Sequence, residues 1–257
     1  MLAFHHRRPL LTRTGATFIA LCLGTAALAR ENDAYDRLVA ATTSPTISDL
    51  VFERDMKIGF DQGLRMDPEL VAEDEACPGL IVGLTEAVRP IMRESHEEGY
   101  GRYREKLEMA LREGLDPAEA ASAADFYETD LAQRFLATFI KQSVADSALD
   151  EVMGDEAREQ EEVPDITAKA QAADKRASVL RTMAALGPDE FQAVVDQLSN
   201  APWFASYNRL SPRINAFQLE MANEELTPEQ DTRFNTAIED FMMAHYEQCE
   251  VPDEPEE

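Results

Sequence analysis

The sequence predicts an all-α fold, an antiparallel helical bundle that contains two related helix-pair repeats. Only 11 of the 257 residues are glycine, and the helix-favouring residues Ala, Leu, Glu and Gln are abundant. Apolar residues return every three or four positions, which is the spacing of an amphipathic helix. No stretch alternates β-branched and polar residues as a half-buried strand does. Hydrophobic residues make up 44% of the chain, which is enough to form a substantial core.

The first 29 residues have the layout of a secretory signal peptide. Three arginines precede an apolar run over residues 16–28, and the small residues Ala27 and Ala29 supply a cleavage site. The run is shorter than the roughly 20 residues of a membrane span. We therefore expect a mature chain that begins near Arg30 and lies in the periplasm or is secreted. An uncleaved anchor is the alternative, and the adjacent arginines leave twin-arginine export open beside the general route.

Residues 30–150 are predicted to form an N-terminal helical half. Helix starts are indicated by a capping residue, in three cases followed by proline at the first helical position. These starts are Asn32 or Asp33, Ser44-Pro45, Asp67-Pro68 and Asp116-Pro117. A long helix is predicted from Leu80 to Gly114, which we expect to end it in a left-handed backbone. Within that helix His96 lies among glutamates, and we expect a solvated charged face there.

Residues 165–249 are predicted to form a C-terminal helical half, after an acidic linker or loop over residues 151–164. We expect Asp165 to cap the first helix of this half. That helix is expected to run through Ala173, Ala177, Leu180 and Met183. Two further helices follow, and Thr227 begins a capping box that starts the last one. Residues 250–257 are expected to be a disordered acidic tail.

Two segments of the chain can be superposed at a shift of 71 residues. They read GLDPAEAASAADFYETDLAQRF and ALGPDEFQAVVDQLSNAPWFASY, and the shift aligns Pro117 with Pro188 and Glu119 with Glu190. Each segment predicts a proline-capped helix, a short break and a second helix. Such helix pairs bury their apolar faces against each other, so the pattern predicts a repeat.

The first of these segments resembles the domain of unknown function (DUF) 2059 family of exported bacterial proteins. The resemblance covers residues 115–142 best and rests on Leu115, Pro117, Glu119 and the pair Phe126-Tyr127. The Ser-Pro-x-Gly break of the family is replaced here by Glu-Thr-Asp-Leu. The second segment is a weaker copy without the Phe-Tyr pair. The resemblance implies an all-helical exported protein and brings no catalytic residues with it.

The charge of the chain argues against a nucleic-acid partner. Fifty acidic residues outnumber 24 basic ones, for a net charge of −26. Removal of the leader would take away basic residues but no acidic ones, so the mature chain would be more negative still. Such a surface repels phosphate backbones and anionic membranes. The acids are expected to be a solvated coat. A reservoir of weak divalent-cation sites is the alternative, although no calcium-loop spacing is present.

Cys77 and Cys249 are the only cysteines after the leader. In an oxidising compartment an even count favours a disulfide, so we expect these two residues to pair. His245 lies one helical turn before Cys249, which makes these two the candidate metal-ligand pair. Two ligands do not make a site and the disulfide competes for Cys249, so we expect neither a metal nor another cofactor.

No common catalytic motif is present: G-x-S-x-G, the P-loop, G-x-G-x-x-G and H-E-x-x-H are all missing. Phe126, Tyr127 and Trp203 are the candidate ligand or interaction residues, with a place in the core as the alternative for each. The sequence therefore favours a non-enzymatic binding or interaction protein of the bacterial cell envelope. A hydrolase-type enzyme with scattered site residues and an acidic cation-binding envelope protein are the alternatives.

Overall fold

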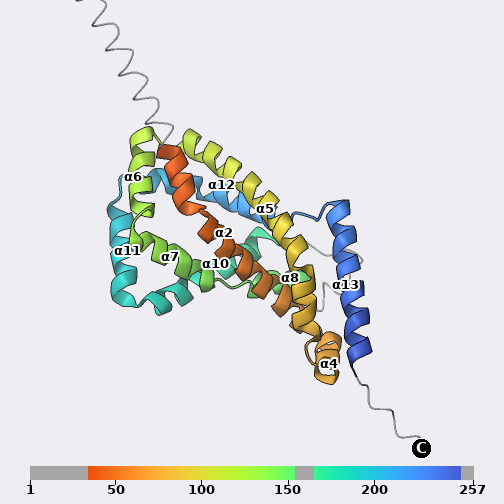
Figure 1. The fold of residues 1–257 in the computed structure, drawn as a ribbon. Helices are drawn as coiled ribbons and strands as arrows, with labels where there is room; N and C mark the ends of the chain where they lie inside the picture. The colour runs from red at the N-terminus through yellow and green to blue at the C-terminus, as the bar shows by residue number, and fades with distance from the viewer. Residues whose placement is uncertain (1–33, 154–164, 250–257) are drawn as a thin grey trace, which may run out of the picture.

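The computed structural model describes residues 34–153 and 165–249, and these residues form helices and connecting loops without a strand (Figure 1). Residues 34–42 form the first helix described. The others are α2 (Pro45–Asp55), the π-helix η1 (Met56–Gln62), α3 (Gly63–Arg65), α4 (Pro68–Ala76), α5 (Leu80–Gly114), α6 (Pro117–Tyr127), α7 (Asp130–Lys141), α8 (Asp146–Met153), α10 (Ala168–Leu186), α11 (Pro188–Asn200), α12 (Phe204–Ala222) and α13 (Pro228–Gln248). The prediction of an all-α fold is confirmed.

The 35-residue helix α5 is the longest described helix, and the helices of both halves of the chain pack against it. At 1.5 Å per residue it is about 52 Å long, longer than one small core can cover. Helix α12 packs along its C-terminal half and α13 along its N-terminal half (Figure 1). The two helices pack against different segments of α5, so α5 connects two separate hydrophobic clusters.

The larger cluster surrounds the C-terminal half of α5. Leu107 and Leu111 of this helix pack with Leu38 of helix 34–42 and with Trp203 and Ile214 of the C-terminal half. Three alanines of α6 complete the cluster and allow that helix to approach closely: Ala120, Ala123 and Ala124. Because residues from both halves of the chain form one core, the halves pack as a unit around α5.

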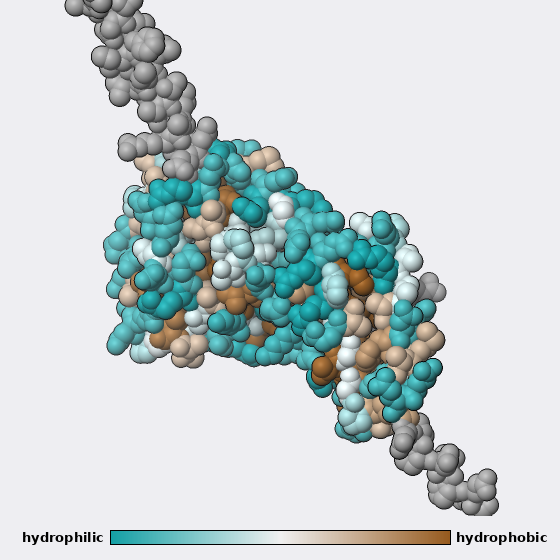
Figure 2. Space-filling view, in the orientation of Figure 1, coloured by the Kyte–Doolittle hydropathy of each residue, from teal (hydrophilic) through white to brown (hydrophobic). Residues whose placement is uncertain are grey.

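The smaller cluster surrounds the N-terminal half of α5. Phe52 and Met56, near the junction of α2 and η1, are buried with Val88. Phe234 and Ile238 of α13 are partly buried against this cluster. Figure 2 shows apolar residues at the surface over this end of the molecule, near α4, α5 and α13. Helix α13 therefore packs mainly against α5, on one side, and leaves its other side exposed.

Four predicted helix starts have the capping contacts that their sequences indicate. The side chains of Ser44, Asp67, Asp116 and Thr227 each accept a hydrogen bond from a backbone N–H in the first turn of the helix that follows. Asp116 and Thr227 form complete capping boxes with the residue three positions on. These caps are local contacts, which is why sequence spacing alone predicts them.

Two predicted details of helix ends are wrong. Gly114 stays in the helical region and Leu115 ends α5 in an extended conformation. A side chain at Gly114 would overlap Leu210 of α12, so close packing of α5 on α12 accounts for this glycine. Asp165 does not cap α10, because the side chain of Thr167 accepts the hydrogen bond from Ala170 N.

Only the first part of the predicted linker lies within the described residues. Helix α8 extends to Met153, so the first residues of the predicted linker are helical. Residues 154–164, the leader and the predicted tail lie outside the described residues. The predicted repeat also stays a prediction: α6–α7 and α11–α12 are both proline-opened helices followed by a short break and a second helix.

We predict that Gly83→Ala destabilises the protein. A methyl group at position 83 would overlap the Phe241 ring of α13, so this ring, or α13 with it, has to move away from α5. Overpacking costs about 1–3 kcal/mol, more than the roughly 1 kcal/mol that alanine gains over glycine in a helix. Thermal unfolding followed by circular dichroism should show a melting temperature several degrees below that of the parent.

Gly101→Ala is the matched control, because it lies on the same helix and a methyl group there has no other atom within 4 Å. This variant should melt at or above the parent temperature. A Gly83→Ala variant that melts like Gly101→Ala would contradict the close packing of α13 on α5.

Candidate functional site

The structure brings together the three aromatic residues that the sequence singled out. The Trp203 ring lies 5.7 Å from the Phe126 ring and 5.8 Å from the Tyr127 ring, between centroids. Trp203 is only 1% exposed. Burial raises the pKa of Tyr127 to about 12, and burial also raises the pKa of its hydrogen-bonding neighbour Tyr207 well above its ordinary value. A ligand contact by Trp203 would require this core to open, so an open binding surface has to be sought elsewhere.

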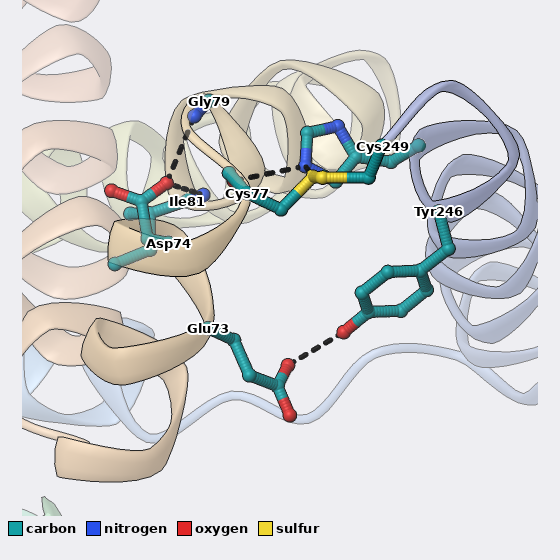
Figure 3. Close-up of a disulfide and its surroundings, with 8 residues drawn as sticks. Glu73, Asp74, Cys77, Gly79, Ile81, Tyr246 and Cys249 are labelled. Carbon is teal, nitrogen blue, oxygen red and sulfur yellow. Dashed lines mark hydrogen bonds between the residues drawn. A yellow bond between two sulfur atoms is a disulfide. The ribbon is translucent and has the colours of Figure 1, made fainter. Parts of the chain in front are cut away.

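Cys77 and Cys249 are joined by a disulfide in the structure (Figure 3). Their Cα atoms lie 5.9 Å apart, well within the range of a disulfide. The bond connects the C-cap of α4 to the C-cap of α13. Close by, the Tyr246 hydroxyl donates a hydrogen bond to the Glu73 carboxylate at 2.6 Å. The end of α13 is therefore held against α4 by a covalent bond and a side-chain contact.

The candidate metal pair is engaged in this arrangement. Cys249 is bonded to Cys77, and His245 Nε2 lies 3.0 Å from Cys77 Sγ and 3.2 Å from the Cys77 carbonyl oxygen. Its ring also stacks on Phe241, with centroids 5.3 Å apart. Over residues 34–153 and 165–249, no group of three or more His, Cys, Asp or Glu residues could hold a metal ion.

His96 is packed between aromatic rings, which corrects the expectation of a solvated charged face. Its ring lies 5.4 Å from Phe52 and stacks on Tyr100 at 5.3 Å. Its Nε2 atom lies 3.2 Å from the Ser48 hydroxyl. Burial lowers the pKa of His96 below its ordinary value of 6.5. The neutral imidazole therefore acts as a packing group between α2 and α5.

Helix α10 buries a polar face. Its most buried residues include Asp174, Ser178 and Thr182, which follow one another at intervals of four and so share one side of the helix. The Asp174 carboxylate accepts hydrogen bonds from Ser147 N and Ala148 N, at 2.8 and 2.9 Å. These N–H groups belong to the first turn of α8 and have no partner within that helix. Asp174 thus acts as a cap supplied by another helix.

Ser178 extends the same contact to the loop before α8. Its hydroxyl accepts a hydrogen bond from Val144 N at 3.1 Å and donates one to the Asp174 carbonyl at 2.7 Å. Thr182 donates to the Ser178 carbonyl in the same way. The buried polar stripe of α10 therefore satisfies backbone groups where α7 ends and α8 begins.

The large apolar residues in the second half of α10 consequently point outward, although apolar residues at helical spacing usually face the core. Leu180 is 65% exposed and Met183 is 44% exposed. Val179 is 39% exposed and lies on the same side. We call these three residues, together with Arg176, the α10 face. An exposed run of large apolar side chains on one helix is characteristic of an interaction surface.

A groove of about 590 Å³ lies beside the α10 face, between α10 and α12. We call it the α10–α12 groove. Its lining residues are Ala168, Gln171, Ala172, Lys175, Arg176 and Val179 of α10 and Asn208, Ser211, Pro212, Asn215, Ala216 and Leu219 of α12. The volume is in the range of pockets that bind small molecules or parts of a partner.

Hydrogen bonds connect the two walls of the groove. At one end, the Asn223 side chain accepts from Ile166 N at 2.9 Å and donates to the Ile166 carbonyl at 3.1 Å. Further along, Lys175 Nζ donates to the Asn215 side-chain oxygen at 2.9 Å. Polar side chains of both segments therefore take part in joining α10 to α12 across the groove.

The groove differs from the rest of the surface in charge. Its lining contains Lys175 and Arg176 but no acidic residue, on a chain of net charge −26. Partial burial lowers the pKa of Lys175 below its ordinary value. Among the described residues, neither Lys175 nor Arg176 has a carboxylate within 4 Å, whereas twelve of the other seventeen lysines and arginines do.

A smaller cavity of about 260 Å³ lies between α5 and α12. Its charged lining residues are already paired with one another: Arg102 with Glu224, and Lys106 with Glu220. The charges of this cavity are satisfied by the fold itself. The α10–α12 groove is therefore the better candidate site.

No family model, curated protein or solved structure matches the chain. None of the helices within the described residues is long and apolar enough to cross a membrane.

Sequence reasoning missed the α10–α12 groove, although part of its signal was present. The polar residues of α10 recur at intervals of four, which marks a polar stripe, but a polar stripe normally faces solvent. The stripe is buried because Asp174 reaches backbone groups 26 and 27 residues earlier in the chain. That pairing is a tertiary contact, and no local pattern predicts it.

We predict that Cys77→Ser lowers the melting temperature under oxidising conditions. The bond closes a loop with a sequence separation of 172, and the chain-entropy treatment assigns such a crosslink about 5 kcal/mol. In reductant the parent and the variant should melt together, which separates loss of the bond from loss of packing. Equal melting temperatures under oxidising conditions would contradict a stabilising disulfide.

We also predict that His96 makes the protein less stable in mild acid. Because its folded pKa lies below 6.5, the unfolded chain binds a proton first as the pH falls. Its contribution is complete above pH 6.5 and is lost as the pH falls through the folded pKa. Between about pH 7.5 and 5.5, the melting temperature of the parent should fall further than that of His96→Gln. Parallel falls would show that His96 is not titrating from a buried neutral state.

Proposed function

We propose that this chain is an exported, non-enzymatic binding protein of the bacterial cell envelope, and that it binds through the α10 face and the α10–α12 groove. The observation that carries this proposal is the outward orientation of Val179, Leu180 and Met183 on a helix whose polar side is buried. Apolar side chains beside an open groove provide the hydrophobic contact area on which most binding surfaces depend.

Export is the second part of the proposal. It is supported by the basic and apolar leader that ends near Ala29. The Cys77–Cys249 disulfide also suits an oxidising compartment. The relation of residues 115–142 to the DUF2059 family belongs to the same proposal, since that family consists of exported bacterial proteins. Mass spectrometry of the protein from an envelope fraction should give a chain that begins near Arg30, and an intact Met1 would contradict cleavage.

The binding role can be tested with a pair of surface variants. Leu180→Glu places a charge on the α10 face, and Val82→Glu places one on α5 at a side chain that is similarly exposed, 55% against 65%. Both positions are open to solvent, so both variants should keep the parent melting temperature. In capture from an envelope extract, Val82→Glu should retain the partner of the parent protein, and Leu180→Glu should recover at least about tenfold less, a loss of roughly 1.4 kcal/mol.

Two results would contradict the proposal. In the first, parent and Leu180→Glu recover the same partner in equal amount, which would place binding elsewhere on the surface. In the second, the parent recovers no partner that is absent from an unrelated acidic helical protein used as bait.

A further inference from the structure

The dimensions of the α10–α12 groove match a short helix. Its lining extends from Ala168 to Val179 on one wall and from Asn208 to Leu219 on the other. Eleven helical steps of 1.5 Å make each wall about 16 Å long, the length of three helical turns. A third helix of similar length can therefore lie along the groove and contact both walls.

Small residues line both walls at the spacing of one helical turn. Ala168 and Ala172 are four residues apart on α10, and Pro212 and Ala216 are four residues apart on α12. Such side chains leave room for larger ones projecting from a docked helix. Val179 and Leu219 supply bulkier apolar contacts at opposite ends of the groove. An amphipathic helix with apolar residues at i, i+3, i+4 and i+7 suits this arrangement.

The charges of the groove indicate which kind of amphipathic helix fits. Lys175 and Arg176 lie at the groove with no described carboxylate within 4 Å, although acidic residues outnumber basic ones two to one in the chain. The Lys175 ammonium has only the Asn215 side-chain oxygen as its described partner. A carboxylate brought by a partner would supply the charge that the fold leaves out.

We propose that the α10–α12 groove binds an acidic amphipathic helix of a partner protein, with the apolar side of that helix between α10 and α12 and its carboxylates on Lys175 and Arg176. This inference rests on the proposed binding function and names the class of partner.

A second copy of this chain is a poor occupant. In a two-fold contact centred on the groove, each subunit presents the same patch to the other. Lys175 and Arg176 would then meet their own equivalents, and like charges in contact disfavour association. A lipid chain also fits poorly, because amide and hydroxyl groups of Gln171, Asn208 and Ser211 line a groove that is open along its length.

The proposal can be tested by selection from a displayed peptide library. The library would hold 14-residue helices with leucine fixed at i, i+3, i+4 and i+7 and with Glu, Lys or Gln at random on the flanking positions. Selection on the full mature protein should enrich Glu over Lys at least several-fold relative to the starting library. Ala216→Glu, which fills the groove wall with a charged side chain, should abolish that enrichment.

Charge reversal separates recognition from a structural effect. The double variant Lys175→Glu with Arg176→Glu should invert the selection and enrich Lys over Glu. Lys57→Glu with Arg104→Glu is the matched control, because it makes the same change in net charge at exposed cations outside the groove. The control should keep the preference of the parent, and a variant that merely unfolds would select neither peptide.

Three outcomes would overturn the proposal. Selection that enriches no charge, or enriches Lys on the parent protein, would exclude an acidic helix as occupant. Dimerisation in light scattering that Ala216→Glu abolishes would assign the groove to a second copy of the chain. Binding of dodecanoate that blocks the groove, without any peptide selection, would assign it to a small amphiphile. In each case a partner that is still lost with Leu180→Glu would leave the broader binding function standing.

Discussion

The length of α5 is the constraint on which the rest of the structure depends. None of the other described helices is longer than 21 residues, so no single one of them can cover the 35-residue helix α5 along its full length. Helix 34–42, α6 and α12 cover its C-terminal half, while α2, η1 and α13 cover its N-terminal half. Both clusters combine helices that precede α5 with helices from the C-terminal half of the chain. The first and the last described helices therefore both pack against α5.

The disulfide has a particular place in this arrangement. Helix α13 packs against one large neighbour only, and Gln230 is the one residue of this helix that is classed as buried. A helix with few fully buried residues gains less from packing than a core helix does, and its C-terminal end is free to fray unless another contact holds it. The Cys77–Cys249 bond lies at that end, where it holds the helix even when its apolar contacts open. The covalent bond thus compensates for a small hydrophobic contact area.

The parts of the fold that follow from local chemistry could be predicted from sequence. The caps at Ser44, Asp67, Asp116 and Thr227 involve partners within three residues, so spacing alone identifies them. The pairing of two cysteines followed from their number and from the expected compartment. The π-helix η1 was not predicted, because it lies within a stretch whose apolar spacing fits an ordinary α-helix equally well. Periodicity identifies a helix but does not resolve its hydrogen-bond register.

The orientation of α10 shows where sequence reasoning fails and why. Apolar residues at helical spacing usually face the core, because the hydrophobic effect favours that orientation. An unsatisfied buried N–H group costs about 1–3 kcal/mol, and α8 together with the loop before it presents three such groups to Asp174 and Ser178. If α10 were rotated so that its apolar side faced the core, these three N–H groups would lose their hydrogen-bond partners. The cost of exposing Leu180 and Met183 is comparable and becomes smaller still if a partner covers them. The same contacts that fix the end of α7 and the start of α8 therefore create the exposed apolar face and the groove beside it. A binding surface on this helix requires no strain elsewhere in the fold, because the backbone groups of the preceding loop already determine which side of α10 faces outward.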